Sequence, residues 1–193
     1  MKVVIIGYNS GNIHSVRLAL QRLNVKAVVS SDPAVIQAAD KVIFPGVGEA
    51  SSAMESIKAN GIIEILPRLQ KPTLGICLGL QLMCRDSEEN ATQCFGIFDI
   101  AVRKFPPLAK VPQVGWNTLF DLKGDLFRDV AENSYVYFVH SYYAELSEHT
   151  VAQTEYIIPY SAAMQKDNFF AVQFHPEKSG KVGELILRNF IKL

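Results

Sequence analysis

The chain has 193 residues, 49% of them hydrophobic and 20% charged, which suits a single α/β domain over residues 1–193 with a sizeable core. Lysine plus arginine and aspartate plus glutamate both number 19, and this balance argues against a general binder of nucleic acid or of membrane surfaces. No apolar run approaches the roughly 20 residues of a membrane span, and residues 1–8 are too short an apolar stretch for a signal peptide. We therefore expect a cytoplasmic protein.

The cysteines are few. Cys77, Cys84 and Cys94 form an odd, sparse set that suggests no disulfide framework and matches no common zinc spacing. A reducing cytoplasm would keep a catalytic thiol usable, and we expect Cys84 to be a buried core residue. The sequence therefore predicts neither a metal site nor a cofactor.

Strands and helices alternate through the first 85 residues. Strands are predicted at residues 3–6, 26–29, 41–44 and 73–76, a turn at 9–12, and helices from there to about 23, from 33 onward, and near 49–59 and 61–70. Asp32 is the expected N-cap of the second helix, with Pro33 at its first position. This order predicts a mostly parallel, doubly wound sheet flanked by helices, with an active site at the carboxyl ends of the strands.

The second half of the chain is predicted to add further strands. Residues 95–120 mix short strands with prolines, residues 135–146 form one long strand, and residues 150–155 pair with it. Residues 169–174 form another apolar strand. A final helix is predicted from about 180 to 193, with a core-facing stripe made by Val182, Leu185, Ile186 and Phe190.

The most informative segment is residues 73–81, Thr-Leu-Gly-Ile-Cys-Leu-Gly-Leu-Gln. An apolar strand runs into Cys77 and a helix starts directly afterwards, which is the layout of a nucleophile elbow. Gly75 and Gly79 leave room where strand and helix pass closely, and the helix N-terminus favours a thiolate at Cys77. The N–H of Leu78 would then point toward a developing oxyanion. The alternative is that Cys77 is a small core residue.

Among the four histidines, His175 is the candidate base. It follows the apolar run at 169–174 and precedes Pro176, which biases it toward an extended conformation. Residues i and i+2 of an extended chain share a face, so Glu177 could hold and orient the imidazole. The alternative is that His-Pro-Glu merely ends a strand.

Pro45-Gly46-Val47-Gly48 ends the third predicted strand at the same edge of the sheet. Its glycines let the backbone approach a substrate and aim N–H groups at an anion. Val47 and Gly48 are therefore candidates to complete an oxyanion hole with Leu78, although alone the segment is only a turn.

Together, Gly-x-Cys-x-Gly-x-Gln, the later His-Pro-Glu and the upstream Pro-Gly-Val-Gly resemble the class I, or triad, glutamine amidotransferases over essentially the whole chain. The resemblance implies the flavodoxin-like α/β fold of that family, with additional antiparallel strands. It implies Cys77 as nucleophile, His175 as general base and acid, and Glu177 as its orienting partner. In such enzymes the cysteine attacks the side-chain amide of glutamine, ammonia leaves, and water releases glutamate from the thioester.

Residues 10–15, 114–117, 137–142 and 176–179 resemble one branch of this family, the glutaminase subunits that form a heterodimer with a (β/α)8-barrel cyclase of histidine biosynthesis and pass ammonia to it. No part of the chain remains for a synthase domain. The resemblance implies that L-glutamine is held by Gly48, Gln81, His140 (through its backbone), Ser141 and Tyr142. It places near the cyclase and the ammonia path Asn12, Trp116, Asn117, Tyr137 and Lys178.

Three of these residues have other interpretations. Gln81 could be a solvated helix residue, Trp116 a core residue, and Lys178 an exposed surface lysine. The chain also departs from the family, whose first strand usually ends Asp-Tyr-Gly, because it has Gly7-Tyr8-Asn9 instead. The departure concerns the expected partner-facing turn and leaves the triad untouched.

Rival functions remain. One is a glutaminase subunit of another synthase, such as anthranilate or pyridoxal phosphate synthase, against which residues 114–117 and 139–142 argue. Others are a cysteine hydrolase of the DJ-1/PfpI type, which the late His-x-Glu and Gln81 disfavour, and a degenerate regulatory subunit. Because free glutaminase activity would waste glutamine, we expect a peptide within 46–48 to turn its N–H inward only when the cyclase docks.

Overall fold

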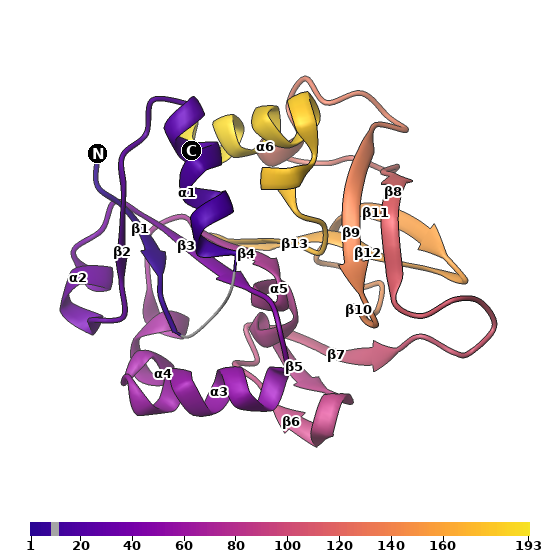
Figure 1. Cartoon of the computed structure of the whole chain (residues 1–193), viewed down its shortest axis with the longest axis horizontal. Helices are drawn as coiled ribbons and strands as arrows, with labels where there is room; N and C mark the ends of the chain where they lie inside the picture. Colours follow the sequence, from indigo (N-terminus) through magenta and orange to yellow (C-terminus); the bar gives the residue numbers. More distant parts are fainter. Residues whose placement is uncertain (9–11) are drawn as a thin grey trace.

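A computed structural model describes residues 1–8 and 12–193 (Figure 1). A seven-stranded sheet in the order β11-β12-β13-β4-β3-β1-β2 passes through the centre of the fold. Its strands are β1 (Val3–Ile6), β2 (Ala27–Ser30), β3 (Lys41–Gly46), β4 (Thr73–Cys77), β11 (Thr150–Tyr156), β12 (Ile158–Lys166) and β13 (Phe169–Val172). Strands β13, β4, β3, β1 and β2 run parallel to one another, whereas β12 is antiparallel to both β13 and β11. The predicted mostly parallel sheet is confirmed.

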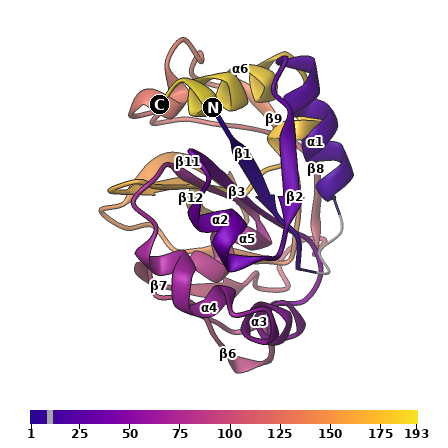
Figure 2. The same cartoon turned by 90° about the vertical axis from the view of Figure 1, so that its left-hand side faces the viewer.

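Helices cover both faces of this sheet (Figures 1 and 2). One face carries α1 (Ile13–Arg22) and α6 (Gly180–Lys192); the other carries α2 (Pro33–Gln37), α3 (Ala50–Ala59), α4 (Ile62–Ile65) and α5 (Leu78–Met83). In β1, Val3 and Ile5 pack into the core beneath α1 and α6, while Val4 and Ile6 pack into the core on the other side. A strand buried on both faces needs apolar residues at every position, which explains the continuous apolar runs.

Two smaller sheets extend the fold beyond β4. A four-stranded sheet has the order β10-β7-β5-β6, and β8 pairs with β9 in a separate two-stranded sheet, here called the β8–β9 ribbon. Their bounds are β5 (Cys84–Ser87), β6 (Thr92–Gln93), β7 (Phe98–Lys104), β8 (Gln113–Thr118), β9 (Tyr135–His140) and β10 (Tyr142–Ala144). Short 3-10 helices cover Leu66–Arg68, Glu89–Ala91, Asp125–Phe127 and Pro176–Lys178.

The prediction of one long strand at 135–146 was wrong. The expected strand is interrupted at Ser141, because β9 pairs with β8 whereas β10 pairs with β7 in a different sheet. The predicted partner, β11, instead forms a hairpin with β12. That hairpin gave no turn signal, because Ile157 takes the left-handed conformation (φ 68°) usually left to glycine or asparagine, and Pro159 lies within β12.

Other boundaries agree more closely. Asp32 caps α2 by accepting a hydrogen bond from the N–H of Ala34 at 2.8 Å. Cys84 is fully buried, as expected, although it opens β5. On α6 the expected core stripe is only partly right, because Leu187 is buried where Leu185 was expected. The predicted turn at 9–12 falls mostly outside the described residues, since only Asn12 is included.

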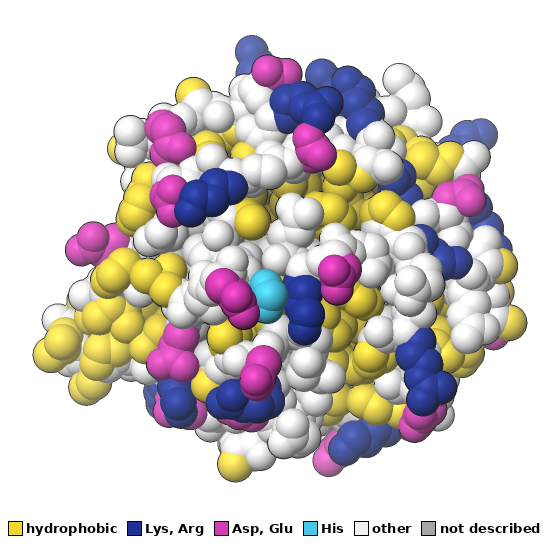
Figure 3. Space-filling model, turned by 180° about the vertical axis from the view of Figure 1, so that it is seen from behind, with side chains coloured by type: hydrophobic (Ala, Val, Ile, Leu, Met, Phe, Trp, Pro, Cys, Tyr) yellow, Lys and Arg dark blue, Asp and Glu magenta, His cyan; other side chains and the backbone are white. Residues whose placement is uncertain are grey.

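The surface mixes charges of both signs, and Figure 3 shows acidic and basic side chains interspersed over much of one face. Exposed large hydrophobic side chains occur together on the β8–β9 ribbon, where Val114, Trp116 and Tyr135 are each more than half exposed. Within the described ranges, no helix combines the length and apolarity needed to cross a bilayer.

Candidate active site

Cys77 occupies a strained bend between β4 and α5. Its backbone dihedrals are φ 54° and ψ −107°, a conformation that L residues rarely adopt. A Cβ atom on Gly79 would lie 2.0 Å from the carbonyl oxygen of Phe44, and one on Gly75 would lie 2.9 Å from the backbone of Gly79. The glycines therefore allow helix and strand to touch, and the predicted elbow geometry is confirmed.

The neighbours of β4 bring distant motifs to this bend. On one side β3 pairs in parallel with β4, so that Gly46 lies level with Cys77. On the other side β13 pairs Val172 with Ile76, so residue 173 follows level with the cysteine. The 45–48 turn and residues 173–175 consequently flank the sulfur although they are far apart in the sequence.

His175 and Glu177 meet as predicted, but by a different local structure. The His175 Nδ1 and Glu177 Oε1 atoms are 2.7 Å apart, and both side chains are almost completely buried. His175 is extended, whereas Pro176–Lys178 forms a 3-10 helix, so the argument from an extended chain through Glu177 was wrong. Burial disfavours the charged imidazole, but hydrogen bonds and charges from Cys77 and Glu177 outweigh it and raise the pKa of His175 to about 10.

Asn12 also reaches this pair. Its amide nitrogen lies 3.2 Å from His175 Nδ1 and donates a hydrogen bond to Glu177 Oε1. The carboxylate oxygen Oε1 thus collects two donors, while Oε2 is buried without a partner among the described residues. The Asn12 amide therefore contacts two members of the candidate triad, His175 and Glu177.

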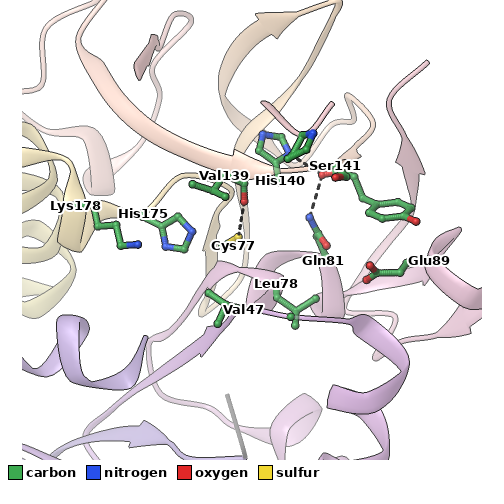
Figure 4. Close-up of a pocket in the computed structure, with 13 residues that line it drawn as sticks. Val47, Cys77, Leu78, Gln81, Glu89, Val139, His140, Ser141, His175 and Lys178 are labelled. Carbon is green, nitrogen blue, oxygen red and sulfur yellow. Dashed lines mark hydrogen bonds between the residues drawn. The ribbon is translucent and has the colours of Figure 1, made fainter. Parts of the chain in front are cut away.

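A cavity of about 310 Å³ opens beside Cys77 (Figure 4). Most of the predicted site residues line it: Val47, Gly48, Cys77, Leu78, Gln81, His140, Ser141, Tyr142, His175 and Lys178. Figure 4 shows His175 and Lys178 at one end, Val47 and Leu78 below the sulfur, and Gln81 and Glu89 toward the other end. The candidate nucleophile, its candidate base and the candidate oxyanion groups therefore line the same cavity.

Gln81 is almost fully buried, so its interpretation as a solvated helix residue was wrong. Its Nε2 atom donates to the carbonyl oxygen of Tyr142 at 3.0 Å and to Oε1 of Gln173 at 3.1 Å. The side chain thereby ties α5 to the 141–142 wall of the cavity and to the strand that carries His175.

The side chain of His140 lies in a buried polar cluster. Nδ1 is 2.7 Å from the carbonyl oxygen of Tyr142, and Nε2 lies 3.1 Å from Gln113 Oε1 and 3.0 Å from Tyr160 Oη. Burial lowers the pKa of His140 to about 4, so the ring is neutral and donates its Nδ1–H to Tyr142. The cluster braces the backbone at 140–142 from behind.

Three features of the site were not predicted from the sequence. Glu89 lines the cavity from a 3-10 helix and accepts a hydrogen bond from the N–H of Ala50 at 2.8 Å. A single carboxylate outside any motif is not recognisable in the sequence as a site residue. The carbonyl of Val139 accepts from the Cys77 thiol at 3.8 Å, a contact of backbone that no residue type reveals. Gln173 could have been found, because strand pairing puts it beside Cys77.

Apart from Asn12, the predicted partner-facing residues divide into two groups. Trp116 is 55% exposed, not core, and its ring meets that of Tyr137 edge-on at 5.9 Å, with the Lys178 ammonium 6.0 Å from the Tyr137 ring. Asn117 instead donates its amide to the carbonyl of Glu155 at 2.8 Å. The structure therefore brings Trp116, Tyr137 and Lys178 together and engages Asn117 elsewhere.

Comparison with known proteins identifies the family to which the chain belongs. Residues 4–193 match the family Glutamine amidotransferase class-I. The imidazole glycerol phosphate synthase subunits HisH of Bacteroides fragilis and Bacteroides thetaiotaomicron are 57% and 54% identical to this chain, with 100% of each chain covered. A solved glutamine amidotransferase of Thermotoga maritima has the same fold, with a TM-score of 0.64 at 16% identity over 100% of this chain and 81% of that one. The chain therefore belongs to the class I glutamine amidotransferases and, within them, to the family of imidazole glycerol phosphate synthase subunits HisH.

Proposed function

We propose that this chain hydrolyses L-glutamine to glutamate and ammonia through a Cys77 thioester and delivers the ammonia to a (β/α)8-barrel cyclase. The cyclase would make imidazole glycerol phosphate and an aminoimidazole carboxamide ribotide in histidine biosynthesis. The observation that carries the proposal is the buried His175, hydrogen-bonded to Glu177 and coupled to Cys77 at the mouth of a cavity with Gln81. Residues 1–193 would act as one amidotransferase unit, in the reducing cytoplasm that a free thiol requires.

The proposed chemistry needs one proton carrier. His175 accepts the proton of Cys77, and its raised pKa favours the resulting imidazolium beside the thiolate that attacks the amide carbon. It then gives this proton to the departing nitrogen, which leaves as ammonia. Glu177 holds Nδ1 and thereby fixes which ring nitrogen faces the sulfur. Water, activated by the same imidazole, then cleaves the thioester to glutamate.

Substrate recognition follows from the two ends of the cavity. Gln81, Ser141 and Tyr142, with the backbone of Gly48 and His140, form the walls that would hold the glutamine chain. We add Glu89 to this set, because its carboxylate lies toward the end far from His175 (Figure 4) and would meet the α-ammonium group of the substrate. Partial burial raises the pKa of Glu89, and a bound ammonium would offset that cost.

The oxyanion hole would combine the N–H of Leu78 with an N–H from Val47 or Gly48. Tyr8 donates its hydroxyl to the carbonyl of Pro45 at 2.7 Å, which fixes the start of this loop, while Gly48 at φ 106° takes a conformation open to glycine. We propose that docking of the cyclase turns an N–H of this loop toward the cavity. Equal rates of glutamine hydrolysis by the isolated chain and by the complex would rule out such a gate.

The cyclase would dock beside Trp116, Tyr137 and Lys178, with Asn12 and Asn117 nearby. An exposed tryptophan next to a tyrosine is the kind of anchor that dominates protein–protein contacts. Lys178 follows Glu177 directly and lines the cavity, so the proposed contact surface reaches the triad. Ammonia would leave the cavity on this side.

The direct test is labelling with 6-diazo-5-oxo-norleucine, a glutamine analogue that alkylates amidotransferase cysteines, in the presence of the cyclase. We expect peptide mass spectrometry to find the adduct on Cys77 alone, and excess glutamine to protect it. Absence of any adduct in the complex would refute the proposal.

A further inference from the structure

A buried amide that the mechanism above does not use contacts the nucleophile. Gln173 is fully buried and directly follows β13, which runs beside β4. Its Nε2 atom lies 3.6 Å from the sulfur of Cys77, and its Oε1 atom lies 3.1 Å from Nε2 of Gln81. The backbone N–H of Gln173 is bonded to the carbonyl of Ala162 at 2.8 Å, so the side chain projects from a fixed strand.

The orientation of this amide follows from a chain of hydrogen bonds that begins at a group with only one role. The carbonyl oxygen of Tyr142 can only accept, so the atom of Gln81 facing it at 3.0 Å is the NH2 group. The same NH2 group faces Gln173, which must therefore present its oxygen. The remaining NH2 group of Gln173 consequently points at the sulfur of Cys77.

Besides His175, the sulfur has two further neighbours, and these have opposite preferences for its charge. The Val139 carbonyl accepts the proton of the thiol at 3.8 Å, and it would face a bare negative charge once that proton leaves for His175. The N–H of Gln173 favours the sulfur most when it is negative, because hydrogen bonds to charged groups are the stronger ones. The N–H of Gln173 therefore offsets the destabilisation of the Cys77 thiolate by the Val139 carbonyl.

We propose that Gln173 is a catalytic residue whose amide N–H donates to the Cys77 sulfur and stabilises the thiolate that attacks the substrate. The proposal rests on the proposed function, in which Cys77 is the nucleophile. The proton passes from sulfur to His175, the new bond forms between sulfur and the amide carbon of glutamine, and Gln173 neither gains nor loses an atom. Because Gln81 donates a hydrogen bond to the oxygen of Gln173, this series of hydrogen bonds connects the sulfur to a wall of the substrate cavity.

The test uses two variants of the full chain. Gln173→Met keeps the length of the side chain, Gln173→Leu replaces it with a shorter apolar one, and both remove the N–H without adding a charge. The first readout is the pH dependence of Cys77 alkylation by iodoacetamide, followed on its peptide by mass spectrometry. The second is the kcat and KM of glutamine hydrolysis with the cyclase present.

We expect the alkylation midpoint of both variants to rise by about one pH unit, and kcat to fall about 10- to 100-fold while KM changes little. Gln70→Met, at an exposed position away from the cavity, should match the parent chain in both assays. Thermal unfolding establishes that each variant is folded, and Gln173→Leu carries the test if the methionine variant is not.

Two results would overturn the proposal. One is an alkylation profile identical to that of the parent chain in a folded variant. The other is a raised KM with unchanged kcat, which would mean that Gln173 only supports Gln81. Failure of the proposed function is a separate outcome, because the parent chain would then take no glutamine-analogue label on Cys77 in the complex.

Discussion

The Cys77 bend and the β8–β9 ribbon are built on opposite principles. The bend lies in a parallel sheet where Phe44, Ile76 and Val172 are fully buried. Strands β3 and β13, which pair with β4 on either side, fix its geometry. The ribbon has two strands, and its outer face exposes Val114, Trp116 and Tyr135. The contrast teaches that the proposed chemistry belongs to a tightly packed part of the fold, while the proposed partner surface lies on an exposed two-stranded part.

The sharpest way to test this separation is to remove the nucleophile. Cys77→Ala should lower glutamine hydrolysis by at least about 10⁴-fold, because no other group at the site can form the thioester. Binding to the cyclase, measured by calorimetry, should persist because the ribbon is unchanged. Cys94→Ala, at a buried cysteine outside the cavity, is the control and should retain activity; residual turnover by the Cys77 variant would argue for another nucleophile.

The second prediction concerns the close packing of helix α5 against strand β3 at Gly79. Gly79→Ala places a Cβ atom 2.0 Å from the carbonyl of Phe44, so we expect a loss of about 3 kcal/mol or more in the free energy of unfolding in urea. Gly96→Ala is the matched control: its φ is 68° but its Cβ would meet nothing within 4 Å, so only backbone strain of about 1 kcal/mol is expected. Equal costs would show that close packing at the elbow is unimportant.

The third prediction uses pH. The folded-state pKa of His140, about 4, lies below the unfolded value of about 6.5, so only the unfolded chain binds a proton between these values. The stability associated with the neutral ring is present above pH 6.5 and is lost as pH falls toward 4, by up to about 3 kcal/mol. His140→Gln should remove this part of the pH dependence in urea unfolding, and parallel curves for the two proteins would contradict it.

The smallest effect is expected at the ribbon. Trp116→Ala should weaken cyclase binding about 10-fold, since it removes an exposed aromatic anchor. It should leave the rate of Cys77 alkylation in the isolated chain unchanged. Val28→Ala, at an exposed position on the β2 edge, should affect neither measurement. A large change in alkylation would show that ribbon and bend are not separable.

Much of the site was predictable because its signals are local. The elbow glycines, the His-Pro-Glu motif and the 45–48 turn are short motifs at strand ends, and a parallel sheet gathers strand ends at one edge. Glu89 and the Val139 carbonyl were missed because a loop carboxylate and a backbone oxygen have no distinctive pattern. Gln81 was expected in the pocket by resemblance and because it lies one helical turn after Cys77. Its burial was not predictable, since it depends on partners distant in the sequence, Tyr142 and Gln173.

The second half of the chain was harder for a physical reason. Strand β9 passes into β10 with one residue between them, so the local pattern is that of a single strand although the pairing partners change. The β11–β12 hairpin turns at Ile157 without glycine or asparagine, which removed the usual signal. Pairing between strands is decided by the whole fold, and periodicity along one strand cannot reveal it.

The pairing of β13 with β4 has a consequence for how the sequence can change. Side chains alternate along a strand, so a single-residue insertion or deletion within residues 169–174 would turn Gln173 and His175 away from the sulfur and present the apolar Phe174. Such a change would hardly alter the composition or the mean hydropathy of the sequence. We therefore expect this stretch to accept substitutions in its buried apolar positions far more readily than any change in its length.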